Sequence, residues 1–278
     1  MNLRNVLFLG GRSKLASVQI RCVEVAKALG CDCRIHEPFA ANIPDQYSAF
    51  VCVKSVLAPG ELAQLAKRGT VIWDIIDSPP PQEHVSIYLA STKTTRELFA
   101  SYGRCKVIPH YHCNLSGQPN PLPRTRRPAW IGSDYWKPHL EGFDFDSYDV
   151  KGMSRDDVIR AHRQIGIGLN FRNPRPPIFW KNHQKLRYRF HVAINSGIKL
   201  INCVGFGIPS VSDQEPAYHE IGADCTIFSS LKKCAKWVRA LQNDDELYLD
   251  LRKKCLRRAA HYHFDTVIEK YRKFLTAL

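Results

Sequence analysis

The chain has 278 residues, of which 44% are hydrophobic and 24% are charged, and these values exclude disorder or a fibrous repeat as the main plan. Its 40 lysines and arginines against 26 aspartates and glutamates give a net charge of +14, so we expect an anionic partner: nucleic acid, an acidic membrane surface or a phosphorylated substrate. No apolar run reaches the roughly 18–20 residues of a membrane span, and the first residues lack the pattern of a signal peptide. Ten cysteines without a Cys-x-x-Cys pair indicate a reduced, cytoplasmic protein.

Short β-rich runs alternate with helical patterns through the first half of the chain, which predicts βαβ units around a parallel sheet and therefore an α/β fold. The expected strands cover residues 6–9, 33–35, 50–53, 71–73, 87–90 and 107–108. The expected helices cover residues 17–29, 59–66 and 92–102.

A proline-rich, basic segment without periodicity, residues 112–128, is typical of a linker between domains. The α/β pattern then resumes, with strands expected at 129–131, 165–171 and 210–211, and helices at 154–163, 191–206, 232–242, 245–262 and 266–275. The sequence thus predicts two domains, residues 1–124 and 125–278, with the last helix packing back on the first domain.

The most informative segment is residues 195–212, where a predicted helix carrying Lys199 ends at two glycines and a proline precedes a short buried strand. Lys199 can meet a phosphate as a point charge, and Gly207 permits a backbone conformation that other residues resist. A helix end before a core strand is the purely structural alternative.

This segment, Lys-Leu-Ile-x-x-x-Gly-x-Gly-Ile-Pro-Ser-Val from Lys199, resembles the C-terminal domain of GT-B glycosyltransferases with the pattern Lys-Leu-Ile-Glu-x-x-Ala-x-Gly-x-Pro-Val-Val. Shorter matches follow the order of that family along the chain, at Gly10–Arg12, Trp73–Pro79, Leu89–Thr92, Val107–Pro109, Trp130–Ser133 and Glu220–Gly222. The resemblance implies two Rossmann-like domains facing across a cleft, the first on the acceptor side and the second on the donor side.

The resemblance also implies a UDP- or GDP-linked sugar donor, with no other cofactor. Lys199 and Arg172 would face the diphosphate, whose growing charge cations and helix N-termini stabilise without a metal. The other residues carried over to the donor site are Gly11, Arg12, Gly132, Ser133, Asn202, Gly207 and Glu220.

Transfer to a hydroxyl also needs the acceptor to be placed and, in inverting enzymes, deprotonated. Asp77 and His84, beside a run of prolines, are the candidates for this catalytic role, with His110 as a third. An ordinary turn at Asp77 and a surface loop at His84 are the alternatives. Retaining members of the family carry two glutamates at the places held here by Ile194 and Asn202, so the stereochemical outcome stays open.

Charge placement is the second functional signal, because no acid occurs from Val158 to Ser212 while nine lysines and arginines do. Aromatic residues interleave with these bases, as in surfaces that track phosphates and stack bases or sugars. The residues expected to bind a polyanion or acceptor are Arg175, Trp180, Lys181, Lys185 and Arg187. A solvated basic face over an aromatic core is the alternative.

These observations favour a metal-independent glycosyltransferase whose acceptor is a hydroxylated base in DNA or another polyanion. A lipid-linked or envelope glycan at an anionic membrane fits the charge as well, and a nucleotide- or nucleic-acid-binding module without catalysis is the third reading. Cys105, His110, His112 and Cys113 lie close in sequence, but their spacing fits no standard zinc site, so no metal is expected.

Overall fold

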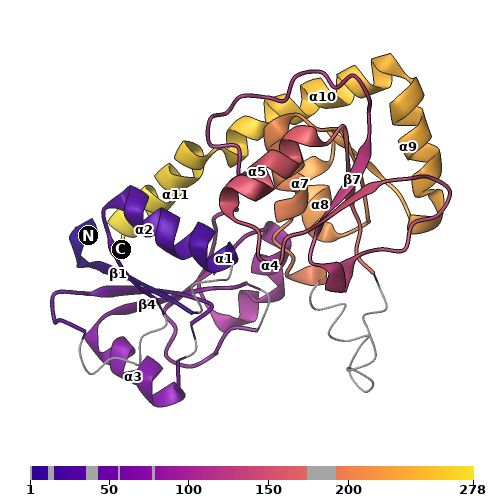
Figure 1. Cartoon of the computed structure of the whole chain (residues 1–278). Helices are drawn as coiled ribbons and strands as arrows, with labels where there is room; N and C mark the ends of the chain where they lie inside the picture. The colour runs from indigo at the N-terminus through magenta and orange to yellow at the C-terminus, as the bar shows by residue number, and fades with distance from the viewer. Residues whose placement is uncertain (1, 12–15, 36–42, 56, 77–78, 174–191) are drawn as a thin grey trace. The chain divides into compact units, whose positions relative to one another are not determined.

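The computed structural model describes every residue except 1, 12–15, 36–42, 56, 77–78 and 174–191. The chain forms two compact units (Figure 1). The first consists of Met1–His110, Ile194–Ser196 and Val267–Leu278, and the second of Tyr111–Ala193 and Gly197–Thr266. Each unit has its own parallel sheet, as the alternating pattern predicts.

The first unit is built on a six-stranded parallel sheet in the order β2-β1-β3-β4-β5-β6. Its strands are β1 (Val6–Gly10), β2 (Asp32–Ile35), β3 (Ala49–Val53), β4 (Thr70–Asp74), β5 (Ile87–Ala90) and β6 (Cys105–Val107). The central strands β1 and β3 are buried along their whole length, which is why they are continuous apolar runs in the sequence. The helices of this unit include α3 (Pro59–Arg68) and α4 (Lys93–Leu98).

The helix predicted over residues 17–29 consists of three pieces, α1 (Ala16–Val18), a π-helical turn (Gln19–Val23) and α2 (Glu24–Leu29). Arg21 lies in the π-helical turn and is 1% exposed. Its guanidinium pairs with Asp74 at the end of β4, at 2.5 Å, and donates to the carbonyl of Ile108 at 2.9 Å. It also lies over the ring of Tyr271, 5.7 Å from its centre. This buried pair therefore ties the first helix to the sheet and to the C-terminal segment.

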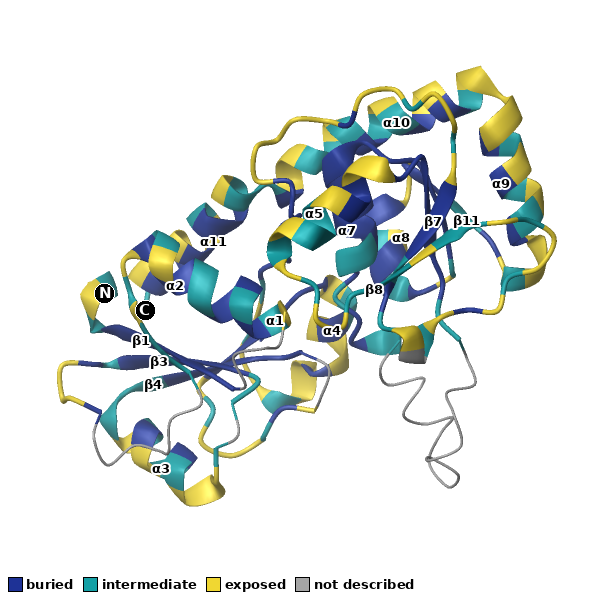
Figure 2. Cartoon of the chain, viewed as in Figure 1, coloured by how far each residue is buried: buried dark blue, intermediate teal, exposed yellow. Residues whose placement is uncertain are grey.

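The second unit has a five-stranded parallel sheet in the order β11-β10-β9-β7-β8. Its strands are β7 (Pro128–Gly132), β8 (Asp146–Asp149), β9 (Ile167–Asn170), β10 (Ser210–Ser212) and β11 (Thr226–Phe228). Its helices are α5 (Arg155–Gln164), α7 (Ile198–Phe206), α8 (Pro216–Gly222), α9 (Cys234–Asn243) and α10 (Asp245–Ala259). Figure 2 shows the inner strands buried and the outer faces of α9 and α10 exposed.

The prediction of one helix over residues 191–206 is wrong in its first half. Residues 195–197 are not helical, and α7 begins only at Ile198, after Gly197 in a left-handed conformation with φ +67°. A Cβ at Gly197 would also lie 2.0 Å from the Cδ1 atom of Ile221, so only glycine fits there. As a consequence, Lys199 lies in the first turn of a helix rather than in the middle of one.

The predicted linker, residues 112–128, is fixed to the second unit by hydrogen bonds. The amide of Cys113 donates to Oδ1 of Asn202 at 2.9 Å, and Asn114 donates to the carbonyl of Gly205 at 2.7 Å. The last helix, α11 (Phe264–Thr276), belongs from Val267 onward to the first unit.

None of the ten cysteines, all of which lie in the described part of the chain, forms a disulfide. Among the described residues, no helix has both the length and the apolar character needed to cross a membrane.

Candidate functional site

The carboxyl ends of three neighbouring strands in the second unit bring several predicted residues together. From β7 the chain runs first to β8 on one side and then to β9 on the other, so the strand order reverses between β7 and β9. Open α/β sheets bind ligands outside the carboxyl ends of the strands at this kind of reversal. Gly132 ends β7 and Arg172 follows the end of β9, so the two residues flank it.

Lys199 is the most unusual side chain of this region. Its Nζ atom is buried and has no hydrogen-bond partner among the described residues. It lies 4.4 Å from the ring centre of Trp130, whose indole N–H is fixed by a 3.0 Å hydrogen bond to the carbonyl of Phe171. Burial, with a contribution from the charge of Arg172, lowers the pKa of Lys199 to about 7. A buried ammonium with no hydrogen-bond partner among the described residues is a candidate position for binding an anion.

Gly132 makes room for this ammonium. A Cβ at Gly132 would lie 2.6 Å from Nζ of Lys199 and 2.6 Å from the ring of Trp130. Any other residue at this position would therefore displace the lysine or the indole. Ser133, the next residue, precedes a short helix (Asp134–Trp136). Its backbone carbonyl accepts a hydrogen bond from the amide of Trp136 at 2.8 Å.

Arg172 contributes a second cation, which is paired with Glu215 at 2.9 Å. The side chain of Glu215 is 2% exposed and that of Arg172 is 15% exposed. The guanidinium of Arg172 also lies 5.8 Å from the ring centre of Trp136. Lys199, Arg172 and Glu215 thus carry one more positive than negative charge when the lysine is protonated.

Glu215 is a site residue that sequence reasoning missed. It precedes Pro216 at the start of α8, three residues after β10, and occupies the position before the helix without capping it. The available signal was the Glu-Pro step directly after a buried strand, since proline favours the first position of a helix. Glu220, which was predicted, lies in the last turn of the same helix and is half-buried.

Two other predicted donor residues have contacts that stabilise the fold. Asn202 is buried, and its side-chain oxygen accepts the bond from Cys113 described above. Gly207 ends α7 with φ +68°, and a Cβ there would lie 2.7 Å from the side chain of Leu256. Their proposed contacts with a donor stay predictions.

In the first unit, Gly11 and His84 lie in the described part of the chain. Gly11 donates to the carbonyl of Val53 at 3.1 Å, and a Cβ there would lie 2.0 Å from the carbonyl oxygen of Lys54. His84 is exposed, has φ +63°, and lies 4.0 Å from the carboxylate of Glu83. The remaining predicted site residues lie outside the described residues: Arg12, Asp77, Arg175, Trp180, Lys181, Lys185 and Arg187.

The cysteine and histidine cluster near the end of the first unit does not form a metal site within the described chain. Across all described residues, no group of three or more His, Cys, Asp or Glu side chains is arranged to hold a metal ion. His110, His112 and Cys113 are buried, and the ring of His112 lies 5.5 Å from that of His263.

Solved structures share this architecture along nearly the whole chain. Anabaena HepE in complex with UDP-glucose matches with a TM-score of 0.61 at 11% identity, over 98% of this chain and 100% of that one. HepE with UDP and glucose matches with a TM-score of 0.58 at 12% identity, over 99% and 100%. The pneumococcal O-GlcNAc transferase GtfA with UDP and GlcNAc matches with a TM-score of 0.50 at 11% identity, over 82% of this chain and 56% of that one.

No family model matches the sequence, and no curated protein does. The structural likenesses, together with the two parallel sheets, show that the chain has the GT-B fold of glycosyltransferases. The predicted fold class and the predicted resemblance are confirmed.

Proposed function

We propose that this chain is a glycosyltransferase that moves a sugar from a nucleotide-sugar donor to a hydroxyl acceptor. The observation that carries this proposal is the buried ammonium of Lys199 at the strand reversal of a GT-B fold. A donor diphosphate supplies the anion that this ammonium lacks. UDP-linked sugars are the first donors to test, because the solved structures with this fold contain UDP or UDP-glucose.

In the proposed reaction, the bond between the anomeric carbon and the diphosphate oxygen breaks, and its electron pair leaves with the nucleoside diphosphate. The acceptor oxygen forms the new bond to the anomeric carbon and loses its proton to a base. Lys199 and Arg172 stabilise the charge on the leaving diphosphate, together with the N-terminus of α7, where Lys199 lies. The proposal of metal independence rests on these cations. Asp77 and His84 remain our candidates for the base.

Glu215 has a positioning role in this scheme. It pairs with Arg172 from the adjacent strand end, so it holds the guanidinium in place and limits the positive charge of the empty site. Gly132 keeps the approach to the ammonium open. The diphosphate of a bound donor would then neutralise the excess positive charge that Lys199, Arg172 and Glu215 carry in the empty protein.

Released nucleoside diphosphate is the direct test, measured with a panel of UDP-, GDP- and ADP-sugars, with and without EDTA and with hydroxyl acceptors. We expect turnover with at least one donor and a large loss in Lys199→Met. Lys236→Met is the matched control, since this lysine is exposed in α9. Nucleotide binding without turnover on any donor would support the non-catalytic module instead, and absence of both would refute the proposed function.

The acceptor is the open part of the proposal. A hydroxylated DNA base was predicted from the basic stretch whose middle, residues 174–191, lies outside the described residues. Duplex binding that weakens steeply with salt would support it, and no duplex binding at low salt would exclude it. A cytoplasmic location also stays a proposal, supported by ten cysteines that form no disulfide in the described chain.

A further inference from the structure

A loop and a helix of the second unit form a surface that is separate from the residues of the proposed donor site. The loop, residues 111–127, lies along α10 and the short helix that follows it (Ala260–Tyr262) (Figure 1). At one end, the amide of His112 donates to the carbonyl of Tyr262 at 2.9 Å. In the middle, Arg252 of α10 donates to the carbonyl of Asn120. The loop therefore runs antiparallel to the helix from its C-terminal end toward its start.

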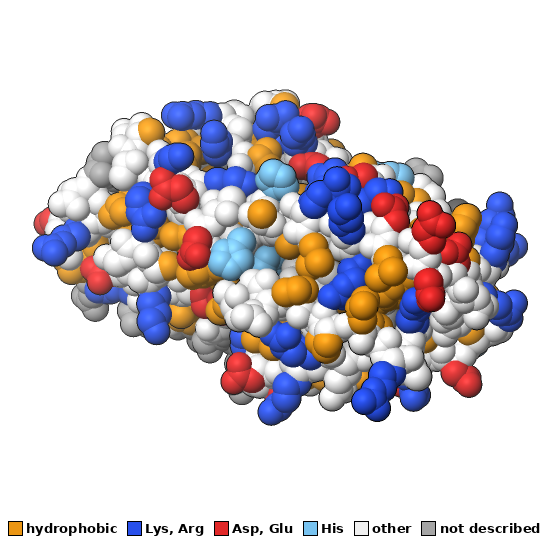
Figure 3. Space-filling model, turned by 90° about the horizontal axis from the view of Figure 1, so that it is seen from above, with side chains coloured by type: hydrophobic (Ala, Val, Ile, Leu, Met, Phe, Trp, Pro, Cys, Tyr) orange, Lys and Arg blue, Asp and Glu red, His pale blue; other side chains and the backbone are white. Residues whose placement is uncertain are grey.

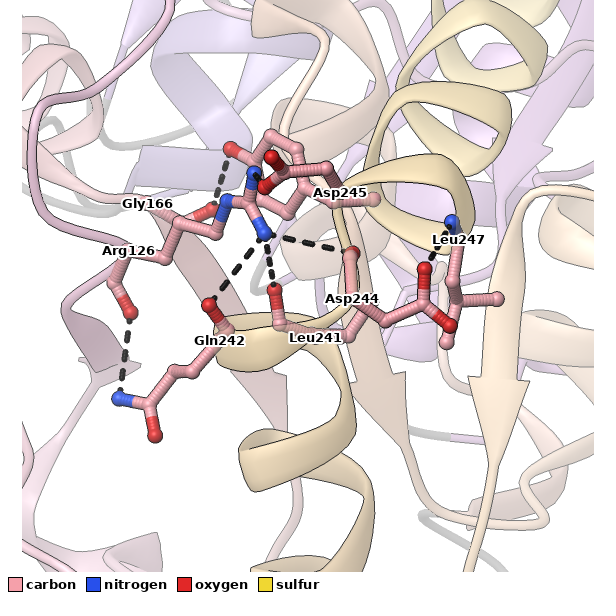
Figure 4. Close-up of polar contacts among 8 residues, drawn as sticks. Arg126, Gly166, Leu241, Gln242, Asp244, Asp245 and Leu247 are labelled. Carbon is pink, nitrogen blue, oxygen red and sulfur yellow. Dashed lines mark hydrogen bonds and ion pairs between the residues drawn. The ribbon is translucent and has the colours of Figure 1, made fainter.

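The third anchor is Arg126, shown in Figure 4. Its guanidinium donates to the carbonyls of Leu241 at 3.0 Å and Gln242 at 3.3 Å, and it pairs with Asp245 at the start of α10. It also lies 4.3 Å from the ring centre of Tyr248. Three anchors, at the junction of α9 and α10, in the middle of α10 and in the short helix after it, hold the loop in a defined position. Its outward side chains therefore form a preorganised surface with those of α10.

Exposed apolar side chains gather on this surface. Four large hydrophobic residues are exposed in the described chain, and three of them lie here: Leu115 at 45%, Leu122 at 61% and Leu249 at 46%. The fourth, Leu98, belongs to the first unit. Leu122 follows the Asn120 anchor on Arg252 and so lies toward the part of α10 that carries Leu249, whereas Leu115 lies toward the Tyr262 end of the loop. Single exposed leucines are ordinary, but several along one surface mark a candidate interaction site.

Exposed cations lie along the same helix and loop. The segment 251–264 contains five lysines and arginines and no acid. Arg252 bonds to loop and helix carbonyls, while Lys254 and Arg258 pair with acids. Lys253 and Arg257 are exposed and form no ion pair in the described chain, but Arg257 lies close enough to Asp224, which pairs with Arg258, to help lower the pKa of that carboxyl. Arg124 of the loop is likewise exposed and unpaired there.

Helical spacing places these groups together. Leu249, Lys253 and Arg257 follow one another at intervals of four residues, so they lie on the same face of α10 and extend over about 12 Å. We call the set the α10 ridge; it consists of Leu115, Leu122, Arg124, Leu249, Lys253 and Arg257. Figure 3 shows apolar, basic and acidic side chains interspersed on the face of the molecule that is seen from above.

We infer that the α10 ridge docks on a lipid bilayer that carries anionic headgroups. Exposed cations attract the headgroups, and leucines between them enter the boundary between headgroups and acyl chains. Nucleic acid would use the cations and leave the leucines exposed to water, which disfavours it as the partner. The acids of α10 lie toward its start, where Asp245 pairs with Arg126 and Asp250 pairs with Lys254. From Lys253 onward α10 carries no acid of its own, and the carboxylate of Asp224, from outside the helix, pairs with Arg258.

Cosedimentation with vesicles tests this inference without any sugar donor, so its outcome is separate from that of the proposed function. Full-length protein is mixed with phosphatidylcholine vesicles or with vesicles containing about one third phosphatidylglycerol. We expect binding to the anionic vesicles only. Lys253→Gln with Arg257→Gln should weaken the partition coefficient about twenty-fivefold, since each cation near an anionic surface contributes about fivefold.

Two matched controls separate the ridge from net charge. Lys232→Gln with Lys233→Gln removes the same charge from exposed positions outside the ridge and should change binding by less than about threefold. Leu122→Ser with Leu249→Ser should weaken vesicle binding, whereas Leu98→Ser should not. Circular dichroism and thermal unfolding verify that each variant is folded.

Three results would overturn the inference. If the variant at Lys253 and Arg257 and the control variant at Lys232 and Lys233 lose vesicle binding equally, the vesicles attract the protein through its net charge alone. Unchanged vesicle binding in the variant at Leu122 and Leu249 would show that these leucines do not enter the bilayer. Duplex DNA binding that depends on Lys253 and Arg257, with no vesicle binding, would assign the surface to nucleic acid.

Discussion

Replacing Lys199 by methionine should change stability and donor binding in opposite directions. Methionine has nearly the length and shape of the lysine side chain, so it fills the same space, and it removes the buried ammonium together with its position over the Trp130 ring. The empty protein no longer holds an uncompensated charge, while a bound diphosphate loses a cation. A residue retained for packing alone would show neither effect.

The magnitude follows from the lowered pKa. A pKa of about 7 in the folded protein, against the usual 10.5, corresponds to about 5 kcal/mol of unfavourable burial of the charged form. Below pH 7 the folded protein bears this whole cost. Between pH 7 and 10.5 the unfolded chain binds the additional proton, so the stability of the wild type rises with pH. The advantage of the variant should therefore be largest near pH 6 and vanish near pH 10.5.

Urea unfolding at pH 6, 8 and 10 measures the first effect, and calorimetric titration with UDP measures the second. We expect the variant to be more stable at pH 6 by about 2–5 kcal/mol and to bind UDP at least about thirtyfold more weakly. A variant that is less stable than the wild type at pH 6 would show that the ammonium has a favourable partner. Unchanged UDP affinity would exclude Lys199 from the donor site.

Three further predictions concern other parts of the chain. Gly132→Ala should reduce donor affinity at least tenfold, because its methyl group displaces the buried ammonium or the indole beside it; equal UDP affinity in calorimetry would contradict this. Arg21→Met should destabilise the protein by about 3–5 kcal/mol in urea unfolding by leaving Asp74 buried and unpaired, and adding Asp74→Leu should recover part of the loss; a double variant no better than the single one would argue against the pair. Burial lowers the pKa of His112 and of His162 to about 4, so stability should fall by about 3 kcal/mol per histidine as pH decreases from 6.5 to 4, and a flat profile over this range would refute the effect.

Most strands and helices were predicted from continuous apolar runs and from glycines that end helices or strands. The strands β1 and β3 were located within about one residue because both faces of each strand are buried, which requires a continuous apolar run. The edge strand β8, Asp146–Asp149, was not predicted as a strand, because its sequence is polar and its pairing with β7 depends on the sheet already being present.

The site was predicted less completely than the fold. Lys199, Arg172 and Gly132 were expected at a donor site, and the structure brings these three positions to one edge of the sheet. Glu215 was missed because a buried acid is stable only through its cation, and no local pattern reveals a partner from another strand. The same limit applies to Arg21, which the helical pattern marks only as a polar position.

The anchors of the loop, residues 111–127, determine which residues of the α10 ridge can be substituted without affecting the fold. These anchors use backbone groups and the side chains of Asn114, Asn120 and Arg126, whereas the side chains of Leu115, Leu122 and Arg124 are exposed. Leu115, Leu122 and Arg124 can be replaced without loosening the loop. The binding preference proposed for this surface can thus be altered by a few substitutions, independently of the scaffold and of the proposed donor site.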